Sequence, residues 1–525
     1  MKLKQANTLW LTLVLVGCGG GGGGDSFPAD TPSTGSVTIS GTVTYDLVPA
    51  NANNIGLDYD AIRKESVKGV RVDAIDISNT SLVSTTTDSS GHYTFSVPNN
   101  TQMKIRVSAK MLRTGTPSWD VKVIDNTNSN ALYVMEGALS PSGTADSQRH
   151  LNASSGWGGT AYTSTRTAAP FAVLDNAYSS MQTVLSANAN TVFPPLQMNW
   201  SISNISVLGD TSLGQITTSH YSNGNLFILG DADSDTDEYD DHVIAHEWGH
   251  YYEDKFSRSD SIGGSHGQNN TLDIRVAFGE GWGNAFSAMA LEDPDYFDTL
   301  GLSQASGFTF NVESGTSATK GWYSESSVQR ILYDVYDSND DSNDTLSLGF
   351  APIHKVFTGA QKSTPAFTSI FTFINALKDE NTGDAVEIDE IVSDENITTI
   401  ADIYGTGRIK KESDYPYHDL IPGTPLAIKI SNADGTYNKL SNRQYVKFTI
   451  ASSRTYSIKV EQSNGTNADP DFYVFDTSPF SRVNFSDGTE PGVEEKSISL
   501  TVGDYLLDVS DYKNILDAQL TVTID

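Results

Sequence analysis

Residues 240–256 run Asp-Asp-His-Val-Ile-Ala-His-Glu-Trp-Gly-His-Tyr-Tyr-Glu-Asp-Lys-Phe, and this stretch decides the fold expected for the middle of the chain. Residues four apart lie on one face of an α-helix, so a helix here directs His246 and His250 toward one metal ion. Glu247 follows one position further round, within reach of a water on that metal. The spacing predicts a zinc site on a helix, with two ordinary surface histidines as the alternative.

A third ligand is needed, because a catalytic zinc ion usually has three protein ligands and one open position. Glu280 stands in a second helical stretch, residues 276–286, and Asn284 shares its face four positions later. The three glycines of this stretch lack side-chain bulk and would let it approach the first helix closely. A solvated glutamate in a glycine-rich turn is the alternative.

The two stretches together resemble the gluzincin metallopeptidases, nearest to the fungalysin group, which carries Gly-Glu-Gly-Trp as this chain does at 279–282. The resemblance implies a thermolysin-like α+β fold with an edge strand that holds the substrate backbone. It also implies that zinc is bound by His246, His250 and Glu280. Glu247 is the general base that it implies.

The chain departs from that family at Asn284, where the family has an aspartate. The partner for a zinc-bound imidazole is then neutral, and such partners orient the ligand and raise its basicity. We therefore expect lower affinity or rate, and not the loss of the site. The reaction also needs a donor for the developing oxyanion. Tyr323, His266 and His354 are available, but we expect each of them to be structural.

The N-terminus resembles a bacterial lipoprotein signal. Two lysines precede an apolar run at 9–16, and Leu-Val-Gly-Cys at 15–18 matches a lipobox. Residues 1–18 are expected to be the signal peptide, with lipid attached to Cys18. Cys18 is the only cysteine, which excludes disulfides and cysteine-protease chemistry. Residues 19–35 would form a glycine-rich tether to the outer membrane, with the protein periplasmic or surface-exposed.

The net charge limits the classes of partner, and the length of the chain limits the number of domains. With 33 basic and 65 acidic residues, a net charge of −32 should repel nucleic acid and anionic membrane. A protein or peptide substrate is expected, with membrane contact through the lipid only. A mature chain of about 500 residues exceeds one hydrophobic core and suggests three domains. No feature specifies the oligomeric state.

Two acidic runs lie near the predicted site. Aspartates alternate at 231, 233, 235 and 237, and a second acidic loop spans 337–344. Alternating carboxylates can bind Ca²⁺, but the glycine and terminal glutamate of an EF-hand are missing. A solvated acidic loop is favoured, with calcium as the alternative.

Two β-rich segments flank the peptidase-like region at 136–421. Residues 36–135 alternate at 37–43 and 70–76, and Thr-Asp-x-x-Gly-x-Tyr at 87–93 resembles the transthyretin-like, carboxypeptidase-regulatory β-sandwich. His92 is expected there as a strand-edge residue without a catalytic role. Residues 426–525 follow two prolines and alternate again, resembling the bacterial pre-peptidase C-terminal β-sandwich. Their strands are expected at 445–450, 456–460, 471–475, 496–502, 505–509 and 520–524.

Within 136–421 the pattern predicts several further elements. Helices are expected at 168–187, 328–336, 367–377 and 386–392, and strands at 198–207 and 226–229. The strand at 226–229 is the predicted substrate-pairing edge, because it directly precedes the metal helix.

Two classes of function fit these patterns. The first is a zinc metalloendopeptidase that hydrolyses extracellular or envelope proteins. The second is a non-catalytic surface binding or adhesion lipoprotein with a degenerate peptidase domain. Retention of Glu247 favours the enzyme, because degenerate sites often lose the base.

Overall fold

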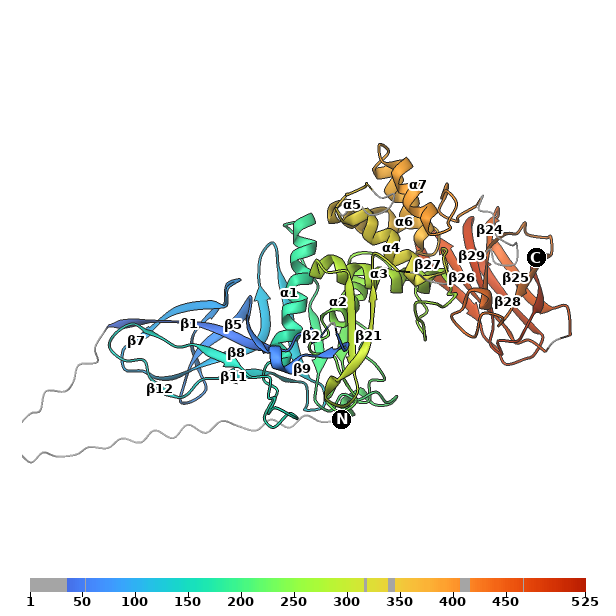
Figure 1. Ribbon diagram of the computed structural model, residues 1–525. Helices are drawn as coiled ribbons and strands as arrows, with labels where there is room; N and C mark the ends of the chain where they lie inside the picture. The colour runs from blue at the N-terminus through green and yellow to red at the C-terminus, as the bar shows by residue number, and fades with distance from the viewer. Residues whose placement is uncertain (1–34, 52, 316–318, 339–344, 407–415, 466) are drawn as a thin grey trace, which may run out of the picture.

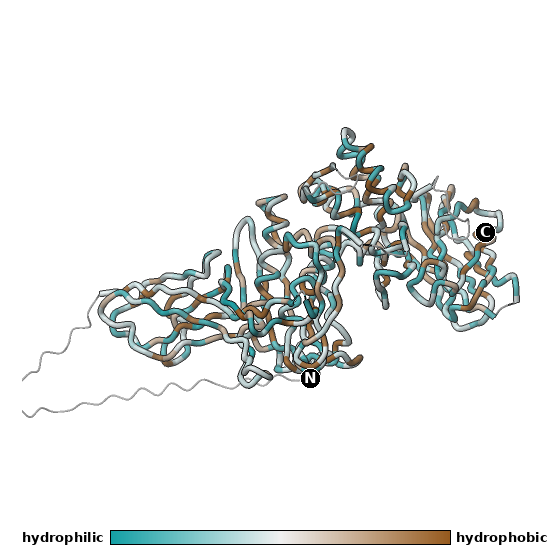
Figure 2. The backbone as a smooth tube through the Cα atoms, in the orientation of Figure 1, coloured by the Kyte–Doolittle hydropathy of each residue, from teal (hydrophilic) through white to brown (hydrophobic). Residues whose placement is uncertain are grey.

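The computed structural model describes residues 35–51, 53–315, 319–338, 345–406, 416–465 and 467–525 (Figure 1). The predicted signal peptide, Cys18 and all of the tether except residue 35 lie outside the described residues. Strands occupy one end of the molecule, helices its middle, and a second group of strands the C-terminal end (Figure 1). Hydrophobic and hydrophilic residues alternate along the strands at both ends (Figure 2). This is the multidomain arrangement of sheets with intervening helices that the sequence predicts.

The N-terminal part is built around strand β1 (Ser36–Leu47), whose alternate residues are buried. It pairs antiparallel with β7 (His92–Pro98) and β4 (Arg63–Ser66). The opposing sheet contains four longer strands: β5 (Val70–Asp76), β6 (Ser81–Thr86), β8 (Gln102–Arg113) and β9 (Trp119–Asp125). Short strands complete this region: β2 (Ala50–Asn51), β3 (Gly56–Leu57), β10 (Ala131–Leu132), β11 (Val134–Glu136) and β12 (Ser140–Pro141).

The larger N-terminal sheet continues into the middle of the chain. Strand β9 pairs parallel with β15 (Leu196–Trp200), β15 pairs parallel with β17 (Asn225–Ile228), and β17 pairs antiparallel with β16 (His220–Ser222). From the other side, β13 (Ser147–Gln148) and β14 (Leu151–Ala153) return to pair with β1. The sequence places a domain boundary between residues 135 and 136, and strands pair across this position. Strand edges that would be exposed in a separate sandwich are paired with the following segment.

Seven α-helices occur among the described residues, and most lie close to their predicted positions. They are α1 (Ala169–Ala187), α2 (Asp241–Phe256), α3 (Ile274–Leu291), α4 (Glu325–Tyr336), α5 (Phe350–Val356), α6 (Ile370–Glu380) and α7 (Ala385–Asp394). Helix α3 is buried from Ile274 to Ala290 because it packs between α2 and α4. The Trp248 and Phe286 rings stack between α2 and α3 with their centroids 5.2 Å apart. A hairpin of β20 (Asp295–Leu300) and β21 (Ser306–Asn311) follows α3, and β18 (Gly230–Asp231) pairs with β19 (Asp235–Thr236) ahead of α2.

The C-terminal part is a sandwich of two sheets. One contains β22 (Tyr417–Asp419), β24 (Arg443–Ile450), β29 (Gly503–Asp511), β26 (Pro470–Thr477) and β27 (Phe480–Ser486). The other contains β23 (Leu426–Ile430), β30 (Ala518–Ile524), β25 (Arg454–Gln462) and β28 (Val493–Leu500). All six predicted strands are present, and β22, β23 and β27 are additional. No helix in the described part of the chain is both long and apolar enough to cross a bilayer.

Candidate metal centre

Helices α2 and α3 bring His246, His250 and Glu280 together. The Nε2 atoms of the two histidines are 3.0 Å apart, and Glu280 Oε2 lies 3.3 Å from each. Zinc bonds of about 2.0–2.1 Å in tetrahedral geometry keep ligand atoms roughly 3.3 Å apart. The three donor atoms therefore have the spacing that a zinc ion requires, and their chemistry, two imidazoles and a carboxylate, suits it.

Glycines make this approach of the helices possible. A Cβ atom on Gly283 would lie 2.7 Å from the His246 ring, so any larger residue would displace that imidazole. A Cβ on Gly281 would lie 2.5 Å from Val328 of α4. This glycine therefore allows the close approach of α4, and not that of α2. The predicted close packing of α3 on the metal helix thus depends on Gly283 in particular.

The electrostatics of the centre favour a cation between the donors. Burial opposes the ionisation of Glu280, but His250 and His266 outweigh it and hold the pKa of Glu280 well below its usual range. Burial likewise opposes protonation of His250, but the Glu280 carboxylate prevails and raises the pKa of His250 to about 9. The buried carboxylate therefore needs positive charge beside it, which a divalent metal would supply in place of the protons.

Glu247 lies next to the same centre. It can offer a carboxylate oxygen within 4.8 Å of ligand atoms of His246 and His250. Its Oε2 accepts a hydrogen bond of 2.7 Å from the backbone N–H of Tyr221 in β16. This bond fixes the carboxylate between the candidate ligands and the edge of the sheet.

The strand at the edge of the large sheet, beside Glu247, is β16 and not the predicted strand at 226–229. Strand β17 covers the predicted range 226–229 almost completely, but it lies between β15 and β16 and is therefore interior. The terminal strand of the sheet order is β16, His220–Ser222. With only three residues, β16 is too short to show an alternating pattern in the sequence.

Asn284 lies behind His246. Its Oδ1 is 2.9 Å from His246 Nδ1, so an Nδ1–H donor there leaves the Nε2 lone pair directed at the centre. The Asn284 amide in turn donates to Gln329 Oε1 at 2.9 Å. Helix α4 thus orients the neutral partner of the imidazole.

His266 is the residue that sequence reasoning left out of the site. It comes from the loop between α2 and α3, and its Nε2 is 3.2 Å from Glu280 Oε2. Its Nδ1 is 2.9 Å from Glu325 Oε2, and Glu325 is only 2% exposed. Burial opposes protonation, but the Glu280 and Glu325 carboxylates raise the pKa of His266 to about 9. The only signal in the sequence is its position between the two ligand stretches.

The two other residues considered as donors have different partners. Tyr323 Oη donates to the carbonyl of Lys320 at 3.3 Å. His354 Nδ1 is 2.7 Å from Tyr252 Oη in the core. Both contacts are structural ones.

The acidic run ahead of α2 is only partly solvated, because Asp233 is exposed whereas Asp237 is buried. Asp235 and Asp237 gather with Asp298 of β20, and one carboxylate oxygen of each lies within 4.8 Å of the others. Asp237 is 3% exposed, and burial together with Asp235 raises its pKa well above the usual value. The cluster differs from the predicted alternating run because Asp298 joins it from a distant strand. Of the second run, only residues 337 and 338 lie within the described residues.

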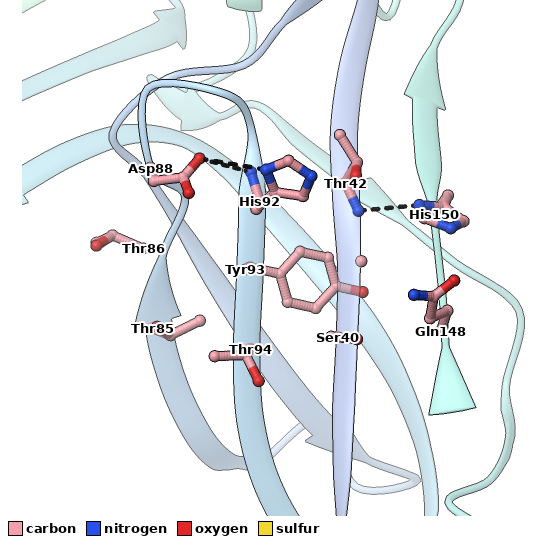
Figure 3. Close-up of a pocket in the computed structure, with 11 residues that line it drawn as sticks. Ser40, Thr42, Thr85, Thr86, Asp88, His92, Tyr93, Thr94, Gln148 and His150 are labelled. Carbon is pink, nitrogen blue, oxygen red and sulfur yellow. Dashed lines mark hydrogen bonds and ion pairs between the residues drawn. The ribbon is translucent and has the colours of Figure 1, made fainter. Parts of the chain in front are cut away.

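His92 lies at a separate cavity of about 450 Å³ on the N-terminal sheets. Figure 3 shows His92 beside Asp88, and His150, which directly precedes β14, accepting a hydrogen bond of 3.1 Å from the Thr42 backbone N–H. The His92 side chain is 64% exposed, and no metal-ligating group among the described residues includes it. It is a strand-edge residue, as expected.

No family model matches this chain, and no curated protein does. Among solved structures, the precursor of protealysin, a metalloproteinase from Serratia proteamaculans, matches 55% of this chain and 90% of its own at 9% identity and a TM-score of 0.33. The pre-peptidase C-terminal domain of a collagenase from Bacillus anthracis matches 21% of this chain and 94% of its own, at 14% identity and a TM-score of 0.17. The surface-associated copper-binding protein CorA of Methylomicrobium album BG8 matches 21% of this chain and 98% of its own, at 6% identity and a TM-score of 0.17. These are partial likenesses with TM-scores below 0.5.

Proposed function

We propose that this protein is a zinc-dependent endopeptidase of the gluzincin type. The observation that carries the proposal is the convergence of His246, His250 and Glu280, with 3.0–3.3 Å between their donor atoms. The carboxylate of Glu247 lies beside these donors, where a general base is needed. A bound zinc ion lowers the pKa of water toward neutrality and polarises a carbonyl oxygen.

The protein's own groups have distinct roles in this proposal. Glu247 accepts the proton of the attacking water and delivers it to the leaving amine. Strand β16 offers its outer edge to the substrate backbone, which adds as a further strand. Because the Tyr221 N–H of β16 also binds Glu247, the same strand positions both the substrate and the general base. His266, oriented by Glu325, donates to the carbonyl oxygen as negative charge develops.

The second candidate is a non-catalytic binding or adhesion protein with a degenerate peptidase domain. The position of Glu247 argues against this second candidate. A metal centre with a purely structural role needs no general base beside its open coordination position. A closed structural zinc site also usually has four protein ligands.

Metal content and hydrolysis together test the proposed function. The purified protein is expected to hold one zinc per chain and to cleave casein. Removal of the metal with 1,10-phenanthroline should abolish cleavage, and added zinc should restore it. A protein that holds one zinc and leaves casein and unstructured peptides intact would support the binding protein instead. The same metal analysis decides whether the Asp235, Asp237 and Asp298 cluster binds calcium.

We also propose that the protein is a lipoprotein anchored to the bacterial outer membrane through Cys18, with protein or peptide partners and no nucleic acid. Cys18→Ser is expected to abolish palmitate labelling and to leave a soluble or unprocessed form, because the thiol is the acceptor of the lipid. Labelling and fractionation of the two forms measure this. A labelled, membrane-bound Cys18→Ser protein would show that another feature anchors the chain.

A further inference from the structure

A segment of the C-terminal sandwich, Tyr437–Leu440, lies along the loop that joins the two ligand helices. The backbone N–H of Leu440 donates to the Thr271 carbonyl at 3.2 Å, and the N–H of Asp273 donates to the Asn438 carbonyl at 2.9 Å. Leu272 and Lys439 form an isolated antiparallel bridge. The loop therefore ends against the sandwich before α3 begins.

Side chains of the same segment hold the backbone just before His266. Asn438 Nδ2 donates to the carbonyls of Gly263 at 2.9 Å and Ser265 at 3.1 Å. Lys439 Nζ donates to the Ser265 carbonyl at 2.6 Å and to Asn438 Oδ1 at 2.7 Å. Ser265 directly precedes His266, so two donors from the sandwich fix the peptide unit that carries the imidazole.

These contacts are buried and closely packed. Asn438 is 1% exposed and Lys439 is 9% exposed. Gly264 has φ +98°, and a Cβ there would lie 2.9 Å from Asn438 Nδ2, so the loop approaches the sandwich as only glycine allows. Burying the Lys439 ammonium group costs free energy unless its N–H donors find acceptors. The Ser265 carbonyl and Asn438 Oδ1 both accept hydrogen bonds from this ammonium group.

The sandwich is also joined to the helix that carries Glu280. Arg275 in the first turn of α3 lies 3.0 Å from Asp508 of β29, and both side chains are at most 3% exposed. Tyr445 of β24 donates to Asp273, the N-cap residue of α3. One rigid support therefore places both Glu280 and His266, which approach each other to 3.2 Å.

We propose that the C-terminal sandwich is a positioning element of the metal centre, in which Asn438 and Lys439 hold His266 at the reacting position. This inference rests on the proposed peptidase function. It assigns a role to a module that would otherwise be a separate appendage. Displacing a group by about 1 Å can cost on the order of 100-fold in rate, which sets the scale of the effect.

The decisive variants are Lys439→Met, which keeps the apolar stem, and Asn438→Asp, which keeps the shape but loses both donors. Lys429→Met is the matched control, because Lys429 lies in the same sandwich and forms a 2.8 Å ion pair with exposed Asp517. We expect each decisive variant to lower kcat about 10- to 100-fold with KM little changed, and the control to match the wild type. Zinc content should stay at one per chain in all of them.

A double-mutant cycle separates positioning from general destabilisation. In a His266→Ala background the additional effect of Lys439→Met on kcat should fall to about 1-fold, because the group being positioned is gone. An equal loss in both backgrounds would overturn the inference. If Lys439→Met does not fold, the same double-mutant cycle is measured with Asn438→Asp.

Hydrogen exchange tests the contact without any reaction. Amides of the peptide that spans residues 258–272 should exchange faster in Lys439→Met and Asn438→Asp than in the wild type or Lys429→Met. Unchanged exchange would overturn the inference even in an active enzyme. A zinc-loaded wild type that cleaves no peptide would instead refute the proposed function, while exchange still decides whether the sandwich holds the loop.

Discussion

Glu247→Gln is expected to reduce peptide hydrolysis by about 100- to 10,000-fold while zinc stays bound, since general acid–base assistance is typically worth that much. Glutamine keeps the size of the side chain and can still accept the 2.7 Å hydrogen bond from the Tyr221 N–H. It cannot take a proton at neutral pH. The measurement is the rate of cleavage of an unstructured peptide at matched zinc occupancy.

Glu292→Gln is a suitable control for this variant, because Glu292 caps the far end of α3 and is exposed. It makes the same chemical change and should leave the rate unaltered. Equal rates for wild type and Glu247→Gln would remove Glu247 as the base and leave the proposed enzyme without one.

Glu280→Gln is expected to lose most of its zinc and with it nearly all hydrolysis. The variant replaces the charged ligand of the set with a neutral amide and leaves the two histidines without their anionic partner. Loss of a partner behind a ligand already costs about 10- to 100-fold in metal affinity, so loss of the ligand itself should exceed about 100-fold. Metal analysis after dialysis against a zinc buffer measures the affinity.

The fold of Glu280→Gln is checked by its thermal unfolding with excess zinc. Glu292→Gln again supplies the control on the same helix. Undiminished zinc stoichiometry and affinity in Glu280→Gln would exclude Glu280 from the ligand set.

The parts of the centre that the sequence predicts are those with a local pattern. The spacing of His246 and His250, and that of Glu280 and Asn284, reflects the helical repeat, and helices α2 and α3 lie where that repeat places them. The convergence of the two helices is not local. Its prediction depends on the needs of a metal ion and on the family resemblance.

The parts that the sequence did not predict depend on distant contacts. His266 enters the centre because residues more than 170 positions later hold its loop. The pairing of β9 with β15 joins strands separated by a long connection, and parallel pairing leaves no turn signal in the sequence. Asp298 similarly joins the acidic cluster from β20, which follows both ligand helices in the sequence.

The pairing of strands from both sides of residues 154–168 affects what a cut in this connection would do. Strand β9 lies before such a cut and β15 lies after it, and the two remain paired. The two fragments would thus stay together as one particle in gel filtration and separate only in denaturant. Maturation by shedding the N-terminal strands would require dismantling the sheet that ends in β16. The N-terminal strands are accordingly part of the sheet that ends in β16, and a chain nicked in this connection should keep that sheet.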